Sequence, residues 1–245
     1  MFTNAKDFAD MLKKQFPNDV DLIDECYTKI LLPISNDQEP EDLPDSLGEP
    51  PIPFFKDEPT LADIENFFLG SRPNIVSFYM WEFVTQHWMW AYVSRPFLDA
   101  FATYLEGKTV LDPFAGRGWL ARGLRERGIH VIATDLHPWP DEASLTEIFP
   151  MDALEAIQTY GPTVDTIILS WVPINDPIDV AIVKENRHNS LLHKELIWMG
   201  ENGGTSGSAG FSKIIKYPET SAAFHAVASK YQTWNGMKDH MYVIE

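Results

Sequence analysis

Apolar residues at the start of the chain recur at three- and four-residue steps, the spacing of an amphipathic helix. Phe8, Met11, Leu12 and Phe16 share one face, and the pattern resumes after a Pro-Asn interruption. This periodicity predicts an N-terminal helical segment over residues 1–32.

The next stretch, residues 33–59, breaks this periodicity. It contains seven prolines and eight acidic residues against a single lysine, a composition typical of an extended, solvated linker. A solvated connector and an arm that covers a site or binds a partner both fit it. A helical lead-in is expected over residues 60–106, with a short helix capped by Thr60 and an aromatic-rich helical stretch that breaks before Pro96.

From residue 107 to residue 245 the pattern changes to short apolar strands that alternate with helices. Strands are expected at 108–112, 130–135, 165–170 and 195–199, and helices at 119–127, 154–159, 179–194 and 219–230. Such alternation predicts an α/β domain with a mostly parallel sheet and helices on both faces. A C-terminal antiparallel hairpin is expected from residues 230–234, an Asn-Gly turn and residues 240–244.

Composition limits the class of protein. The chain has 245 residues, 44% of them hydrophobic, which is enough for one sizeable core with an appendage. The single cysteine, Cys26, excludes an intrachain disulfide and a cysteine-based zinc cluster, and favours a cytoplasmic location. No signal peptide and no run of about 18 apolar residues is present, so no membrane span is expected.

The net charge of −17 makes this an acidic protein, which repels phosphate backbones and argues against a general grip on DNA or RNA. Arg117, Arg122, Arg125 and Arg127 surround one predicted helix. A solvated helix face and a local nucleic-acid patch both explain them. The histidines lack metal-ligand spacing, and no metal site is expected.

The segment VLDPFAGRGWLARGLRERGIHVIATD, residues 110–135, has the clearest chemical signal. One strand ends at Asp112, a glycine-containing turn follows, and the next strand ends at Asp135. Gly116 and Gly118 allow the backbone to turn tightly and approach a ligand, and Asp135 is placed to accept hydrogen bonds from a ribose diol. Asp112 opposes a pyrophosphate but suits an ammonium or sulfonium group, which favours S-adenosylmethionine over a dinucleotide.

These residues resemble the class I S-adenosylmethionine-dependent methyltransferases, in an Asp-Pro-Phe-x-Gly-x-Gly variant common among nucleobase amino-methyltransferases. The resemblance covers residues 75–245 and implies a Rossmann-like domain at 107–245 that binds S-adenosyl-L-methionine. The residues it assigns to the cofactor are Asp112, Pro113, Phe114, Ala115, Gly116, Gly118, Asp135, Leu136, Asp152, Ala153 and Ser170.

Four further segments resemble a little-characterised subset of this family: 90–96, 170–173, 200–205 and 234–239. The second is a Ser-Trp-x-Pro, where amino-methyltransferases hold Asn, Asp or Ser followed by Pro-Pro-aromatic. The resemblance implies that Ser170 and the backbone near Trp171 hold the acceptor, whereas Ile174 stands where a base-stacking aromatic is expected. The expected catalytic residues are Ser170, Trp171, Pro173 and Glu201, with Glu201 as a base on the glycine-rich loop 200–210.

Three functions fit these observations. The favoured one is a methyltransferase whose acceptor is a small molecule or another substrate that is not a nucleic acid. The alternatives are a nucleic-acid amino-methyltransferase and a non-catalytic module that binds S-adenosylmethionine or a partner. The net charge and the missing base-stacking aromatic disfavour the nucleic-acid substrate.

Overall fold

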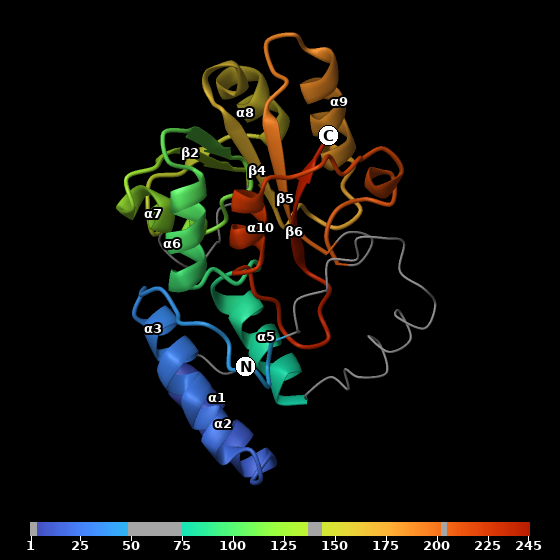
Figure 1. Cartoon of the computed structure of the whole chain (residues 1–245). Helices are drawn as coiled ribbons and strands as arrows, with labels where there is room; N and C mark the ends of the chain where they lie inside the picture. The colour runs from blue at the N-terminus through green and yellow to red at the C-terminus, as the bar shows by residue number, and fades with distance from the viewer. Residues whose placement is uncertain (1–3, 49–74, 137–143, 202–204) are drawn as a thin grey trace. The chain divides into compact units, whose positions relative to one another are not determined.

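The computed structural model describes residues 4–48, 75–136, 144–201 and 205–245 (Figure 1). The chain separates into two compact units. Unit 1 comprises Met1–Trp88 and Gln232–Met237, and unit 2 comprises Met89–Tyr231 and Lys238–Glu245. The division falls inside the segment 60–106 that was expected to be one helical lead-in.

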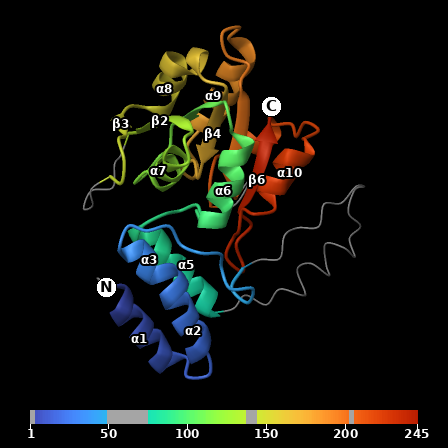
Figure 2. The ribbon, with the colours of Figure 1, turned by 60° about the vertical axis from the view of Figure 1, so that its left-hand side comes forward.

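Unit 1 is helical, as the periodicity of residues 1–32 predicts. Its helices are α1 (Ala5–Gln15), α2 (Val20–Cys26), the π-helical turn η1 (Tyr27–Leu31), α3 (Leu32–Ser35) and α5 (Ile75–His87). Figure 2 shows α1, α2 and α5 packed together. The Asn4 side chain caps α1 by accepting a hydrogen bond from the Asp7 N–H at 2.8 Å. Phe8 of α1 stacks on Phe83 of α5 with ring centroids 3.9 Å apart.

The acidic, proline-rich segment differs from the expected extended form in its described part. Helix α3 continues past residue 32, because a proline is tolerated in the first helical turn. Leu43 and Leu47 are buried rather than solvated. The Leu43 N–H donates to Gln232 Oε1 at 2.8 Å, and the Asn235 N–H donates to the Leu47 carbonyl at 2.6 Å. Residues 49–59 and the short helix expected from Thr60 lie outside the described residues.

Unit 2 is an α/β unit built on a sheet of six strands in the order β3-β2-β1-β4-β5-β6. The strands are β1 (Thr109–Asp112), β2 (His130–Asp135), β3 (Phe149–Pro150), β4 (Thr166–Ser170), β5 (Glu195–Gly200) and β6 (His240–Ile244). Neighbouring strands from β3 to β5 are parallel, and β6 is antiparallel to β5. The expected mostly parallel sheet is therefore confirmed, and β3 is an addition to it.

The expected C-terminal hairpin is wrong. β6 pairs with β5, with Ile197 opposite Val243, and residues 231–233 form no strand. The Asn-Gly turn is present, with the Met237 N–H donating to the Trp234 carbonyl at 2.9 Å. The chain passes from unit 2 to unit 1 just before the turn, between Tyr231 and Gln232.

Helices lie on both faces of the sheet. Those of unit 2 are α6 (Arg95–Tyr104), α7 (Trp119–Glu126), α8 (Ala153–Tyr160), α9 (Ile178–His188) and α10 (Ala222–Ala228). In Figure 1, α6 and α10 lie in front of the sheet, and α8 and α9 lie behind it. The core on the α8 and α9 side includes Leu111, Ile167, Leu169, Leu196 and Trp198 from the strands. Strands that are covered on both faces explain the unbroken apolar run of β4. None of the helices in the described ranges is long and apolar enough to cross a membrane.

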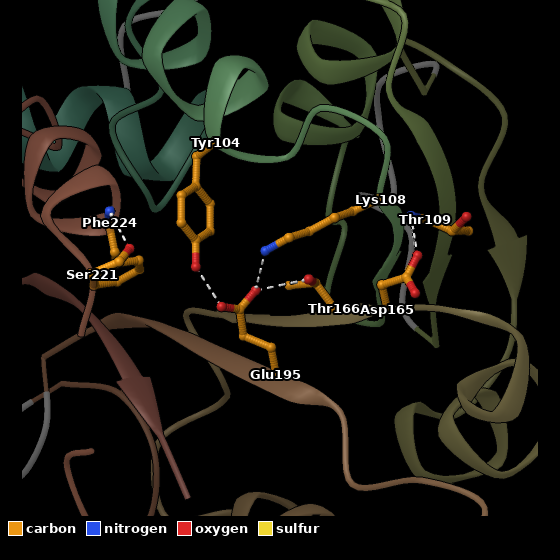
Figure 3. A network of polar contacts seen from close by, with 8 residues as sticks. All are labelled: Tyr104, Lys108, Thr109, Asp165, Thr166, Glu195, Ser221 and Phe224. Carbon is orange, nitrogen blue, oxygen red and sulfur yellow. Dashed lines mark hydrogen bonds and ion pairs between the residues drawn. The ribbon is translucent and has the colours of Figure 1, made fainter. Parts of the chain in front are cut away.

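A polar network ties the amino-terminal ends of these strands together (Figure 3). The Glu195 carboxylate accepts hydrogen bonds from the Tyr104 hydroxyl, from Lys108 Nζ at 3.0 Å and from Thr166 Oγ1 at 2.9 Å. Burial and then the hydrogen bond to Glu195 raise the pKa of Tyr104. One carboxylate thus joins α6 to β4 and β5.

Replacing this carboxylate is expected to destabilise the chain. In Glu195→Gln the charge-assisted bond from Lys108 is lost and an amide NH₂ meets groups that are themselves donors, so the unfolding free energy should fall by about 2 kcal/mol. Urea denaturation measures this loss. The matched control is Glu126→Gln, which removes an exposed carboxylate 3.4 Å from Arg122. The control should change stability by less than about 0.5 kcal/mol, and equal losses in the two variants would contradict the assignment.

Candidate cofactor and acceptor site

The candidate site lies at the carboxyl-terminal edge of the sheet in unit 2. The strand order reverses between β1 and β4, so the loops that follow these two strands leave in opposite directions. Ligands of open α/β sheets bind in the crevice outside such a reversal point. The loop after β1 begins at Asp112, and the loop after β4 begins at Ser170.

The loop after β1 depends on its glycines. Gly116 and Gly118 have φ angles of 55° and 89°, in the left-handed region where a side chain is strained. A Cβ at Gly118 would also lie 2.8 Å from Thr146 Cγ2. Gly118 is the N-cap of α7, so the tight turn places the start of that helix directly after the loop.

Asp112 is buried with only part of its hydrogen-bonding capacity used. It is 1% exposed, and its Oδ1 has no hydrogen-bond partner among the described residues. Burial raises the pKa of this carboxyl to about 7; the Phe114 N–H lowers it, the charge of Asp135 raises it and that of Arg125 lowers it. A buried carboxylate oxygen without a donor is a site that a ligand N–H group would satisfy.

Asp135 joins the end of β2 to the same loop. Its Oδ2 accepts a hydrogen bond from the Gly116 N–H at 2.8 Å, and the Ala115 N–H donates to the Thr134 carbonyl at 3.1 Å. The two acids singled out in the sequence are thus brought to one loop. Leu136, which follows Asp135, is 53% exposed.

Asp152 has a structural role that the sequence analysis did not identify. It is the N-cap of α8, and its Oδ1 accepts hydrogen bonds from the Leu154 and Glu155 N–H groups at 2.9 and 3.3 Å. Two further cofactor candidates differ in exposure: Ala153, which follows Asp152, is buried, whereas Phe114 of the β1 loop is partly buried against the core.

Trp171, after β4, adopts an unusual backbone conformation. Its φ angle is 48°, its N–H donates to the Met199 carbonyl at 2.7 Å, and its indole Nε1 donates to Asp239 Oδ2 at 3.0 Å. Its ring lies 5.5 Å from that of Trp90 at an interplanar angle of 33°. Ser170 is partly exposed, and Pro173 is exposed.

Sequence reasoning missed two residues that form one hydrogen-bonded group with Trp171: Tyr231 and Asp239. The Tyr231 hydroxyl donates to Asp239 Oδ2 at 2.6 Å, so Asp239 accepts from both Tyr231 and Trp171. The signal that could have found Asp239 is the resembling segment 234–239, which ends in this acid, but the resemblance assigns no role to it. Three of the four resembling segments contribute to the group through Trp90, Trp171 and Asp239.

No protein-family model matches the chain, and no curated protein matches it.

Glu201 uses both of its carboxylate oxygens within unit 2. Oε2 accepts from the N–H and the hydroxyl of Thr205 at 2.9 and 2.8 Å, and Oε1 accepts from the Lys238 N–H at 3.2 Å. Residues 202–204 lie outside the described residues. These bonds order the described part of the loop, a role different from that of the expected base.

The arginines near α7 do not form an open basic face. Arg125 donates to the Val131 carbonyl and to Thr146 Oγ1, Arg127 donates to Asp99, and Arg117 is only 6% exposed. In the part of the chain that the structure describes, no group of three or more His, Cys, Asp or Glu side chains is placed to hold a metal ion.

Proposed function

We propose that this chain is an S-adenosylmethionine-dependent methyltransferase with a Rossmann-like catalytic domain. The observation that carries the proposal is the unpartnered Oδ1 of buried Asp112, next to the loop that Asp135 holds through Gly116. The strand order from β3 to β5 supports it, because Asp112 ends a strand at the reversal point of the sheet and Asp135 ends the neighbouring strand.

The residues present fit the proposed cofactor. A cationic ammonium group would supply the donors that Asp112 Oδ1 lacks, and the ionised carboxylate would gain an opposite charge. Asp135 would accept from the ribose hydroxyls, and Leu136 and Asp152 would lie beside the adenine, as the family resemblance implies. When bound, S-adenosylmethionine supplies an electrophilic methyl group. The protein contributes proximity and orientation.

A dinucleotide is a poorer fit. A pyrophosphate would lie near the carboxylates of Asp112 and Asp135, and Asp112 is already disfavoured in its charged form by burial. The repulsion between the pyrophosphate and these carboxylates would add to the free-energy cost that burial already imposes on ionised Asp112.

The proposed acceptor is a small molecule or another substrate that is not a nucleic acid, held by Ser170, Trp171 and Pro173. The net charge of −17 and the internal bonding of Arg125 and Arg127 support this choice. A non-catalytic cofactor-binding module is the second candidate, and the hydrogen bonds that occupy both carboxylate oxygens of Glu201 favour it.

Isothermal titration calorimetry tests the proposal directly. The purified chain should bind S-adenosylmethionine and S-adenosylhomocysteine with micromolar dissociation constants and should not bind NAD. Binding of NAD alone would identify a dinucleotide site, and binding of none of the three would refute the methyltransferase. Tight binding of both adenosyl ligands without methyl transfer to any screened acceptor would favour the non-catalytic module.

A further inference from the structure

Trp171 is held in a backbone conformation that its side chain disfavours. A φ angle of 48° is rare for a bulky residue and persists only where the surroundings enforce it. Two hydrogen bonds do so here: the backbone N–H to Met199 and the indole Nε1 to Asp239. Such strain is concentrated at functional sites, and it fixes the indole where β4 ends.

Asp239 has an acceptor to spare. Its side chain is buried, with the residue 4% exposed, and its two hydrogen-bond donors among the described residues, Trp171 and Tyr231, both bond to Oδ2. Oδ1 has no hydrogen-bond partner among the described residues. An indole N–H and a phenol each supply a single donor, so neither can also satisfy Oδ1.

The surroundings of Asp239 leave its ionised form without an opposite charge among the described residues. Burial raises the pKa of the carboxyl to about 7; the hydrogen bonds from Tyr231 and Trp171 lower it, and the negative charge of Glu201 raises it. Burial also lowers the pKa of neighbouring His240, which keeps the imidazole neutral at physiological pH. No salt bridge to Asp239 occurs within the described ranges.

An aromatic pair adjoins this carboxylate. Trp90 is 45% exposed and its ring lies 5.5 Å from that of Trp171, which is hydrogen-bonded to Asp239. Indole faces attract ammonium groups electrostatically. An unpaired carboxylate oxygen, next to an indole that donates to the same carboxylate and lies against a second, exposed indole, is a combination that binds a cationic amine and has no particular use for a phosphate or a neutral sugar.

We propose that Trp90 and Asp239 belong with Trp171 to the acceptor site and that the acceptor is an alkylamine, bound as its ammonium ion. This inference rests on the proposed methyltransferase function. Asp239 Oδ1 takes one proton from the ammonium ion, which leaves a neutral amine with a free electron pair. That pair forms the N–C bond to the sulfonium methyl while the C–S bond breaks and its electrons remain on sulfur. The product is an N-methylammonium ion, and the proton on Asp239 passes to water when the product leaves.

The test uses the indole N–H signals of the 15N-labelled chain, with the Trp171 and Trp90 signals assigned from Trp171→Phe and Trp90→Phe. Titration with n-butylamine hydrochloride at about pH 8, where Asp239 is ionised, should shift the Trp171 and Trp90 signals saturably. n-Butanol, a neutral molecule of similar size, should not. Equal shifts with both probes, or no shift with either, would overturn the proposal.

Two variants locate the carboxylate. Asp239→Asn should weaken n-butylammonium binding about tenfold or more, and Tyr231→Phe, which keeps the carboxylate, should still bind it. Unchanged affinity in a folded Asp239→Asn variant would overturn the proposal. The methyltransferase proposal can fail independently of the amine site. If the chain binds n-butylammonium saturably but does not bind S-adenosylmethionine, the amine site stands and the methyl-transfer step is refuted.

Discussion

Between pH 4 and pH 8, the unfolding free energy of Asp112→Asn is expected to rise by about 4 kcal/mol relative to that of the unsubstituted protein. The cause is the buried carboxyl, whose pKa is raised from 3.8 to about 7 in the folded chain. The folded state therefore binds this proton more tightly than the unfolded state does. Its contribution to stability is fully present below about pH 3.8 and is lost as the pH rises through about 7. Asparagine has no such proton, so the variant lacks this loss.

Urea unfolding at about pH 4, 6 and 8 measures the effect. Asp239, whose pKa is also raised to about 7, contributes with the same sign. Asp112→Asn should therefore reduce the pH dependence without abolishing it. Asp165→Asn, which changes an exposed carboxylate of the same unit, serves as the control. Parallel pH profiles for Asp112→Asn and the unsubstituted chain would show that Asp112 is not the buried titrating group.

Asp135→Ala should weaken S-adenosylmethionine binding about 100-fold or more. The substitution removes the acceptor proposed for the ribose hydroxyls, and two charge-assisted hydrogen bonds account for about 3 kcal/mol, which is about a factor of 100. It also removes the bond from the Gly116 N–H at 2.8 Å, so the loop after β1 loses a tether. Calorimetric titration of the variant measures the change.

A closely matched control exists at the other edge of the sheet. Asp165 Oδ2 also accepts a backbone N–H at 2.8 Å, from Thr109. Asp165→Ala therefore removes a carboxylate and a bond of the same kind where no ligand is proposed, and the affinity should stay within about threefold. An equal loss in both variants would mean that general destabilisation, and not ribose binding, explains the result.

The architecture of unit 2 could be predicted because its strands are set by local patterns. The alternation of apolar runs and turn residues gave β2 and β6 the bounds that the structure has. β3 has only two residues and no periodicity to detect. The hairpin prediction failed because a strand pattern does not specify its partner: the sequence shows β6 as a strand, but only tertiary packing places it against β5.

The site was predictable to a similar extent. Asp112 and Asp135 end neighbouring parallel strands, so their proximity follows from the fold. The unpartnered Oδ1 of Asp112 depends on burial, which a motif does not report. The bond from Trp171 to Asp239 joins residues 68 positions apart, and nothing in the local sequence of either indicates it.

Unit 1 is built from two segments that lie far apart in the sequence, and this has a consequence for how the chain folds during synthesis. Leu43 bonds to Gln232, 189 residues later, and Gly48 forms a β-bridge with Trp234. These contacts can form only after residues 232–237 have left the ribosome. The N-terminal helices, although they are made first, must therefore wait for almost the whole chain before unit 1 is complete. Contacts of such long sequence separation slow folding, and a chaperone that shields the early helices would act in that interval.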